Sequence, residues 1–311
     1  MSEIRPRVLV LMATYNGADW LPEQLTSILN QKDVDLTVQV RDDASSDRTC
    51  EIIRDVAAAA PLSLSAASSG SGSAGSNFRS LMKEADASDF DYIALADQDD
   101  IWLSDKLIRA IDSLKRNGAE GYSSAVEAFW PNGHTAAIVQ SPATTRADFL
   151  FEGAGQGCTF VLTQYLFQKV RTFLVSNSED CERLHYHDWL IYLVARANGM
   201  SWIFDPRPSM RYRQHGGNEI GARGGFTAVK RRLALIRNGW YLRQIQAAAR
   251  LYCLLGAREK VAQAIAERFS QVTPPDAFLG QVRLAYLISR YGRRRVSDRA
   301  VLVFAAFARW I

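Results

Sequence analysis

Three short, largely apolar runs alternate with helical patterns along the first hundred residues. The runs over residues 7–13 and 93–96 are nearly continuous, which is typical of strands that are buried on both faces of a parallel sheet. The run over residues 36–40 alternates apolar and polar residues and predicts another strand. Apolar residues recur at helical spacing after the first two runs, over residues 21–29 and 49–60. Two successive strand–helix units predict an α/β fold with a parallel sheet and right-handed crossovers.

The third apolar run ends abruptly in Asp97-Gln98-Asp99-Asp100. Ligands of open α/β sheets bind beyond the carboxyl ends of the strands, so we expect these acids at the mouth of a cleft. Three ionised carboxylates in one place repel one another unless a cation lies between them. Mg²⁺ and Mn²⁺ prefer oxygen ligands and substrate phosphates, and we therefore predict a metal–diphosphate site. A solvated turn or a helix cap is the alternative.

Polar residues also follow the first two predicted strands, as Thr14-Tyr15-Asn16-Gly17 and as Arg41-Asp42-Asp43. The parallel architecture is typical of nucleotide-binding proteins, but the glycine fingerprint of dinucleotide enzymes is absent, which argues against NAD. Asp42 and Asp43 are also suited to cap the helix that follows them.

Two segments rich in small residues lie inside the predicted domain. Residues 68–78 consist mainly of Ser and Gly, which favours a loop of the substrate cleft over a passive linker, because small residues let a backbone approach a ligand closely. Three glycines precede an apolar strand within residues 151–162. A loop that contacts substrate is predicted there too, with a glycine-rich β-bulge as the alternative.

The four cysteines are far apart and form no CxxC pair, so neither a disulfide framework nor a cysteine-based zinc site is indicated. The apolar run near the N-terminus is too short for a signal peptide. No stretch approaches the roughly 18 uninterrupted apolar residues of a membrane-spanning helix. We therefore expect a cytoplasmic chain that is neither exported nor transmembrane.

Six motifs stand in order along the chain: Ala13-Thr14-Tyr15-Asn16-Gly17, Val40-Arg41-Asp42-Asp43-Ala44-Ser45-Ser46-Asp47, Gly72-Ser73-Ala74-Gly75-Ser76-Asn77-Phe78, Asp97-Gln98-Asp99-Asp100-Ile101-Trp102, His187-Asp188-Trp189 and Tyr212-Arg213-Gln214-His215-Gly216-Gly217-Asn218. Together they resemble glycosyltransferase family 2, and its bacterial rhamnosyltransferase branch in particular. Each motif alone is a weak signal, whereas six in order are a strong one. The resemblance implies a GT-A fold, in which helices flank a Rossmann-like, mostly parallel sheet.

In this resemblance the end of the first strand holds the nucleobase, through Thr14, Tyr15 and Asn16. Asp42, in preference to Asp43, accepts the proton on N3 of the pyrimidine, a role that requires an acceptor-only carboxylate. Asn77 is expected on the same substrate-binding surface.

Asp97 and Asp99 form the DxD element of the family. The resemblance implies that Asp99 contacts a Mg²⁺ or Mn²⁺ ion, while Asp97 contacts the sugar or ribose and contributes to the metal site. His215 is expected to reach the metal or the diphosphate. Asp100 either orients the donor sugar or begins the next helix.

Transfer with inversion requires a base that takes the proton of the acceptor hydroxyl as the new bond forms. The resemblance places this base at Asp188, near the start of a predicted helix, where a capping acid is the alternative. It also places donor-sugar and acceptor contacts at Gly155 and Gln156. Arg213 is suited to clamp phosphate oxygens.

Charge is divided unevenly along the chain. Residues 221–311 carry 17 Lys and Arg against 4 Asp and Glu, a net charge of +13, which leaves −9 for the first 220 residues. From residue 226 onward the tail is predicted to be mostly helical, with helices over residues 251–265 and 278–291 and an apolar last segment. Basic residues beside apolar helices fit adsorption to an anionic membrane surface, and helix packing with a solvated basic face is the alternative. No motif predicts nucleic-acid binding.

The combined prediction is a GT-A domain over residues 1–220 and a basic helical extension over residues 221–311. The chain is interpreted as a metal-dependent inverting transferase that uses dTDP-L-rhamnose. Its acceptor is predicted to be a polyprenyl-diphosphate-linked surface polysaccharide at the inner face of the cytoplasmic membrane. The donor rests on the resemblance alone, and a UDP-hexose transferase is the nearest alternative.

Two other classes are less well supported. A sugar-nucleotide pyrophosphorylase would carry a glycine-rich, basic phosphate loop after the first strand, and Thr14-Tyr15-Asn16-Gly17 lacks it. A catalytically silent nucleotide- or glycan-binding module would be expected to have lost an acid, whereas all the candidate acids are present.

Overall fold

The computed structural model describes residues 5–215, 234–270, 278–308, 310 and 311. The chain divides into two compact units. We call the first the sheet unit; it consists of Met1–Gln140, Gly155–Ser176 and Met200–Ala222. The second, the helical unit, consists of Ser141–Ala154, Asn177–Gly199 and Arg223–Ile311. The helical unit thus includes two segments that precede the domain boundary predicted at residue 220.

The described part of the sheet unit contains a nine-stranded sheet with the order β3-β2-β1-β4-β8-β6-β9-β5, and β7 pairs with β6. The strands are β1 (Arg7–Thr14), β2 (Asp35–Asp42), β3 (Leu62–Ala66), β4 (Tyr92–Ala96), β5 (Ile101–Trp102), β6 (Gly121–Phe129), β7 (Thr135–Ile138), β8 (Val161–Thr163) and β9 (Trp202–Arg213). The four strands from β3 to β4 are parallel, as predicted. Beyond β4 the sheet is mixed, because β8 runs antiparallel to both β4 and β6.

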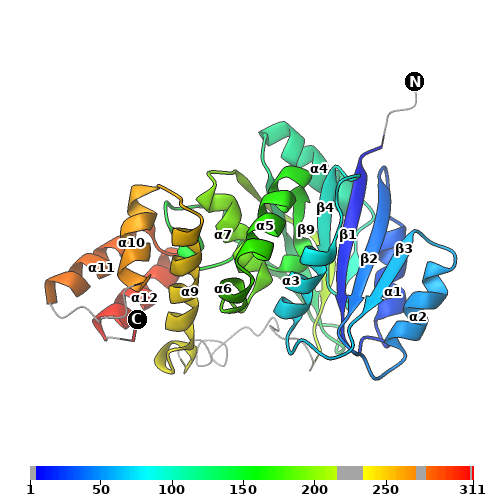
Figure 1. The fold of residues 1–311 in the computed structure, drawn as a ribbon, viewed down its shortest axis with the longest axis horizontal. Coiled ribbons are helices and arrows are strands. Elements are labelled where there is room, and N and C mark those ends of the chain that lie inside the picture. The colour runs from blue at the N-terminus through cyan, green and yellow to red at the C-terminus, as the bar shows by residue number, and fades with distance from the viewer. Residues whose placement is uncertain (1–4, 216–233, 271–277, 309) are drawn as a thin grey trace. The chain divides into compact units, whose positions relative to one another are not determined.

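Helices cover both faces of this sheet. Those of the sheet unit are α1 (Leu21–Leu29), α2 (Thr49–Ala57), α3 (Ala74–Glu84), α4 (Lys106–Asn117), the 3₁₀ helix η2 (Gly157–Thr159) and α5 (Gln164–Ser176). Val8, Val10 and Met12 of β1 share an apolar core with residues of α1, α2 and α4. The alternate residues Leu9 and Leu11 are also buried and point to the opposite face, where α3 and α5 lie in front of the strands in Figure 1. The continuous apolar run therefore predicted double burial correctly.

The serine- and glycine-rich segment is only partly a loop. The hydroxyl of Ser73 accepts a hydrogen bond from the backbone N–H of Ser76 and caps α3, which begins at Ala74. Residues 68–72 precede this cap and form the remaining loop.

The helical unit contains the 3₁₀ helix η1 (Asp148–Leu150), α6 (Ser178–Glu182), α7 (His187–Ala197), α9 (Trp240–Leu254), α10 (Lys260–Ser270), α11 (Phe278–Tyr291) and α12 (Val296–Phe307). The prediction of one helix over residues 251–265 is wrong. Gly256 has a left-handed φ of +63°, and this turn separates α9 from α10. The predicted start of the helical tail at residue 226 lies outside the described residues. Among the described helices, none is both long and apolar enough to cross a membrane.

Candidate active site

The carboxyl ends of β1, β2 and β4 meet at one edge of the sheet because the three strands are parallel and paired in register. Thr14 pairs with Asp42 across β1 and β2, and Met12 pairs with Ala96 across β1 and β4. The polar residues that follow these strands are therefore brought together, as expected for a ligand-binding edge.

Asp42 is fully enclosed at this edge. Its side chain has no exposed area and accepts hydrogen bonds from the Thr14 hydroxyl at 2.8 Å, the Ser45 hydroxyl at 2.6 Å and the Ser45 backbone N–H at 2.8 Å. A carboxylate that is buried and already hydrogen-bonded is poorly placed to accept a nucleobase proton. This geometry favours Asp43 over Asp42 as the acceptor.

Asp43 follows β2 and retains 6% exposure. Both of its carboxylate oxygens lie 2.9 Å from the backbone N–H of Ser71, and the Ser71 hydroxyl donates to Oδ2 at 2.9 Å. Asp43 thus connects the end of β2 to the serine-rich loop. The Arg41 guanidinium also lies 3.5 Å from Oδ1, so the small exposed area that Asp42 lacks is what leaves Asp43 open to a further donor.

The turn after β1 presents an aromatic ring. Tyr15 is 57% exposed, while its backbone N–H and C=O are held by the Gln98 amide at 2.8 and 2.9 Å. Asn16 has a left-handed φ of +47°, and its side-chain oxygen accepts from the Ser46 N–H at 2.8 Å. The backbone is therefore fixed and the Tyr15 ring remains accessible. The role of Gln98 was missed in the sequence, although it lies inside the acidic motif.

Asn77 has a supporting position. It is 2% exposed, its amide donates to the backbone carbonyls of Thr14 and Arg41 at 3.2 Å each, and its oxygen accepts from the Arg41 guanidinium at 2.7 Å. These bonds tie α3 to the ends of β1 and β2. They favour a positioning role over the predicted direct contact with substrate.

The acids after β4 have different partners. Oδ2 of Asp99 lies 2.7 Å from Nε2 of His215, whose ring stacks on Trp20 with centroids 4.0 Å apart. The ligand atoms of Asp97, Asp100 and Cys158 all lie within 4.8 Å of one another. The predicted metal ligands are thus split into an Asp99–His215 pair and a cluster that contains Asp97.

This acidic site fits a hard divalent cation. Asp100 is fully buried, and apart from the thiol of Cys158 no donor among the described residues reaches its Oδ2. Burial raises the pKa of Asp100 well above its usual value, and the charges of Asp99 and Asp97 add to the shift. A bound cation would offset this repulsion. Carboxylates suit Mg²⁺ or Mn²⁺, whereas burial also raises the pKa of Cys158, so its neutral, soft thiol does not.

Arg213 is held by the protein itself. Its Nε donates to the backbone carbonyl of Asp99 at 2.9 Å, its guanidinium pairs with Glu23 of α1, and it lies over the Phe129 ring at 4.8 Å. These contacts favour a role in positioning the acidic loop over the predicted phosphate clamp.

Gly155 and Gln156 form a tight turn before η2. Gly155 has a φ of +118°, and a Cβ there would lie 2.8 Å from Cγ of Gln140. The backbone carbonyl of Gln156 accepts from the N–H and hydroxyl of Thr159 at 3.0 and 2.7 Å. Backbone geometry is thus sufficient to require the glycine, and substrate contact by these two residues stays a prediction.

A buried lysine near the acidic cluster was missed in the sequence. Lys106 has no exposed area; its ammonium donates to the backbone carbonyl of Cys158 at 2.7 Å and lies 3.1 Å from the centroid of the Trp102 ring. Burial lowers its pKa from 10.5 to about 7, an effect that Cys158, Asp100 and Asp97 oppose. A lysine in the first turn of a helix is the available signal, because a cation is disfavoured there.

Asp188 lies in the helical unit, in the first turn of α7. Tyr186 occupies the N-cap position and makes no side-chain cap bond, so the capping alternative predicted for Asp188 does not apply to that position. Asp188 is partly exposed, as a base that must meet an incoming hydroxyl requires.

Known proteins resemble the chain in sequence. The family model described as "Glycosyl transferase family 2" matches residues 9–136. The protein "dTDP-rhamnosyl transferase RfbG" of Shigella flexneri is 41% identical over 236 residues, which cover 75% of this chain and 82% of that protein.

Solved structures share the fold at low identity. S. aureus TarS (residues 1–349) in complex with UDP-GlcNAc has a TM-score of 0.59 and 16% identity, over 97% of this chain and 87% of that one. The mannosyltransferase PcManGT from Pyrobaculum calidifontis, in complex with GDP-Man and Mn²⁺, has a TM-score of 0.51 and 20% identity, over 98% and 87%. The architecture is therefore the GT-A arrangement of a mixed α/β sheet with flanking helices.

Lys106→Met should remove part of the pH dependence of stability. The Lys106 pKa is about 7 in the folded chain against 10.5 for an ordinary lysine, so the unfolded state binds more protons between these values and stability rises with pH across this window. In the wild type, Lys106 should raise the free energy of unfolding by about 2 kcal/mol between pH 7 and pH 9. The Lys106→Met variant should lack this increment. Urea unfolding in EDTA at both pH values measures the increment.

The variant Lys115→Met serves as the control, because Lys115 is an exposed lysine of the same helix. It should retain the wild-type increment. An equal increment in Lys106→Met and wild type would show that the buried lysine keeps an ordinary pKa.

Proposed function

Because the chain belongs to glycosyl transferase family 2, we propose that it transfers L-rhamnose from dTDP-L-rhamnose, with inversion, to a lipid-linked surface polysaccharide. The observation that carries the donor assignment is the 41% identity to dTDP-rhamnosyl transferase RfbG across 82% of that protein. Family membership makes the chain a glycosyltransferase.

The nucleobase is assigned to the edge formed by β1 and β2. A thymine ring offers an N3–H donor and a face for stacking, so it requires an acceptor and an aromatic partner. Asp43 supplies the acceptor and the exposed ring of Tyr15 the stacking surface. Thr14 and Asn16 support them: the Thr14 hydroxyl donates to Asp42, the last residue of β2, and the Asn16 side-chain oxygen accepts from the N–H of Ser46 beyond it.

Mg²⁺ or Mn²⁺ is assigned to Asp99 and His215, with Asp97 and Asp100 in the same acidic surroundings. When bound, the ion neutralises charge on the departing nucleoside diphosphate. The residues of the chain supply the orientation: Arg213 fixes the backbone of Asp99, and Trp20 supports the imidazole of His215 by stacking.

Asp188 is assigned as the base. Its carboxylate removes the proton of the acceptor hydroxyl while that oxygen attacks the anomeric carbon from the face opposite the diphosphate. One displacement gives inversion and needs no covalent intermediate. The buried thiol of Cys158 therefore has no nucleophilic role.

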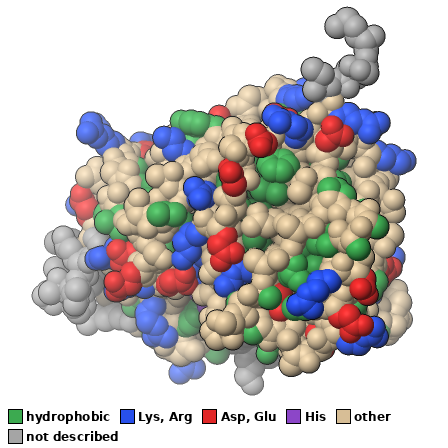
Figure 2. Space-filling view, turned by 45° about the vertical axis from the view of Figure 1, so that its right-hand side comes forward, with side chains coloured by type: hydrophobic (Ala, Val, Ile, Leu, Met, Phe, Trp, Pro, Cys, Tyr) green, Lys and Arg blue, Asp and Glu red, His purple; other side chains and the backbone are tan. Residues whose placement is uncertain are grey.

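The outer face of α12 is assigned to an anionic membrane surface, where a polyprenyl-linked acceptor would be located. Apart from Ser297, its exposed side chains are apolar: Val296, Ala300, Val301, Phe304 and Phe307. Exposed arginines lie on α11 and before α12: Arg283, Arg290 and Arg295. Apolar side chains beside cations suit an anionic interface. By contrast, charges of both signs are interspersed on the face drawn in Figure 2.

A panel of nucleotide sugars tests the donor. With Mg²⁺ or Mn²⁺ present, dTDP-L-rhamnose should raise the melting temperature and release nucleoside diphosphate faster than UDP-glucose, UDP-galactose or UDP-GlcNAc, because the donor pocket is assigned to a thymine nucleotide. A response to UDP sugars alone would replace the rhamnose assignment by the UDP-hexose alternative. Stabilisation without release would indicate a silent binding module.

Two substitutions separate donor binding from proton transfer. Asp99→Asn should weaken Mn²⁺-dependent binding of dTDP-L-rhamnose by about 10-fold or more, because a metal ligand is lost. Asp188→Asn should leave that dissociation constant unchanged and lower turnover by about 100-fold or more. Isothermal titration and diphosphate release measure the two quantities.

The control for both is Asp112→Asn, an exposed acid on α4, which should match wild type. Full turnover by Asp188→Asn would remove the base assignment, and unchanged metal-dependent binding by Asp99→Asn would remove the metal assignment.

Vesicle flotation tests the membrane surface. The full chain should float with phosphatidylglycerol vesicles, and Phe304→Ser with Phe307→Ser should lower the bound fraction several-fold, because two exposed rings are lost. A matched pair on α5, Tyr165→Ser with Val175→Ser, also removes two exposed apolar side chains and should bind normally. Equal binding to neutral phosphatidylcholine, or equal loss in both pairs, would contradict the assignment.

A further inference from the structure

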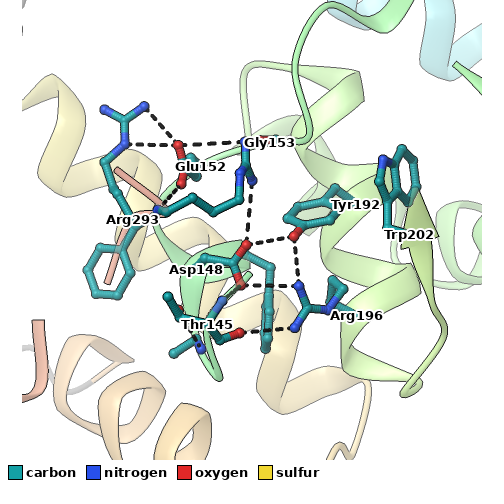
Figure 3. Close-up of polar contacts among 12 residues, drawn as sticks. Thr145, Asp148, Glu152, Gly153, Tyr192, Arg196, Trp202 and Arg293 are labelled. Atoms are coloured by element: carbon teal, nitrogen blue, oxygen red, sulfur yellow. Dashed lines mark hydrogen bonds and ion pairs between the residues drawn. The ribbon is translucent and has the colours of Figure 1, made fainter. Parts of the chain in front are cut away.

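A buried ionic network joins segment 148–154 to α7. Asp148 is fully buried and accepts hydrogen bonds from the Tyr192 hydroxyl at 2.6 Å and from the Arg196 guanidinium at 3.2 Å, both of which come from α7. In Figure 3, Tyr192 and Arg196 point toward the Asp148 carboxylate. The backbone carbonyl of Phe149 also accepts from the Trp189 ring N–H at 2.8 Å. Segment 148–154 is therefore fixed along α7, the helix that carries the assigned base Asp188.

The same segment is bound by the corner between α11 and α12. Arg294 is 3% exposed; its guanidinium donates to the backbone carbonyl of Gly153 at 2.9 Å and lies 3.5 Å from the Asp148 carboxylate. Glu152 accepts from the Arg294 backbone N–H and pairs with the Arg293 guanidinium at 3.1 Å. A C-terminal corner far away in sequence thus determines where Gly153 lies.

Gly153 in turn contacts the first turn of α7. A Cβ added at this glycine would lie 3.1 Å from Cα and 3.2 Å from N of Trp189, and 3.4 Å from Oδ1 of Asp188. The first two distances join it to backbone atoms, which cannot rotate away as a side chain can. Any displacement of Gly153 toward the helix therefore moves the residue assigned as the base.

We propose that Arg294 and Gly153 are positioning residues for Asp188, so that the corner between α11 and α12 holds the base in its working geometry. The proposal rests on the assigned role of Asp188. General bases act only within hydrogen-bond reach of the proton that they remove, and small misplacements of reacting groups lower rates steeply. Arg294 acts by holding the Gly153 carbonyl and by neutralising Asp148, and its burial argues against a direct role in substrate binding.

Gly153→Ala is the sharpest test. Diphosphate release from dTDP-L-rhamnose is measured with water as the acceptor, so the identity of the natural acceptor is not needed. We expect kcat to fall about 10-fold while the KM and the dissociation constant of the donor change less than twofold. In an Asp188→Asn background the same substitution should cause no further loss, because the residue that it displaces no longer acts.

Arg294 variants provide an independent test. Arg294→Met should also lower kcat with little effect on donor binding, and Arg294→Lys should fall in between, because lysine keeps the charge without the two-pronged geometry. Arg258→Met, at an exposed position of the same unit, should match wild type. If Arg294→Met does not fold, Arg294→Lys and Gly153→Ala decide.

The positioning role would be overturned if Gly153→Ala turned over like the wild type. It would also be overturned if Gly153→Ala lowered kcat by the same factor in the wild-type and Asp188→Asn backgrounds. Full turnover by Asp188→Asn alone would instead remove the base assignment itself, so the two failures are distinguishable.

Discussion

Repulsion among three carboxylates at the end of β4 is the constraint on which the candidate active site depends. Asp100 is buried completely, where ionisation is costly, and Asp99 and Asp97 raise its pKa further. The surrounding groups reduce this penalty: the Arg213 N–H donates to Asp100, and the His215 ring lies against Asp99. A bound divalent cation would complete the compensation, so the electrostatics of this cluster support the proposed metal site.

The edge proposed for the nucleotide is preorganised by buried residues. Thr14, Asp42 and Asn77 are buried, and their hydrogen bonds lock the ends of β1 and β2 together. This arrangement leaves Tyr15 and Asp43 at the edge with their backbones fixed. Rigid support of this kind is what keeps binding groups in a productive geometry.

The candidate base, Asp188, lies within the helical unit. Segment 148–154, helix α7 and the C-terminal helices form one compact unit, and Arg294 connects them through buried polar contacts. Buried ion networks stabilise a fold only modestly because desolvation offsets their attraction. The main effect of this network is to fix the position of α7, and its effect on the free energy of unfolding is small.

The sequence by itself determined the parallel core, because nearly continuous apolar runs indicate strands that are buried on both faces. It also located the acidic edge, because polar residues follow each predicted strand. The motifs also identified the family. Tertiary structure decided which of the two acids after β2 keeps some exposed area. Asp42 and Asp43 are adjacent in sequence, and only the strand register and the donors around Asp42 distinguish them. Lys106 and Arg294 likewise acquire their roles from partners that are distant in the chain. Local patterns report burial and turn chemistry, whereas charge compensation depends on which segments the fold brings together.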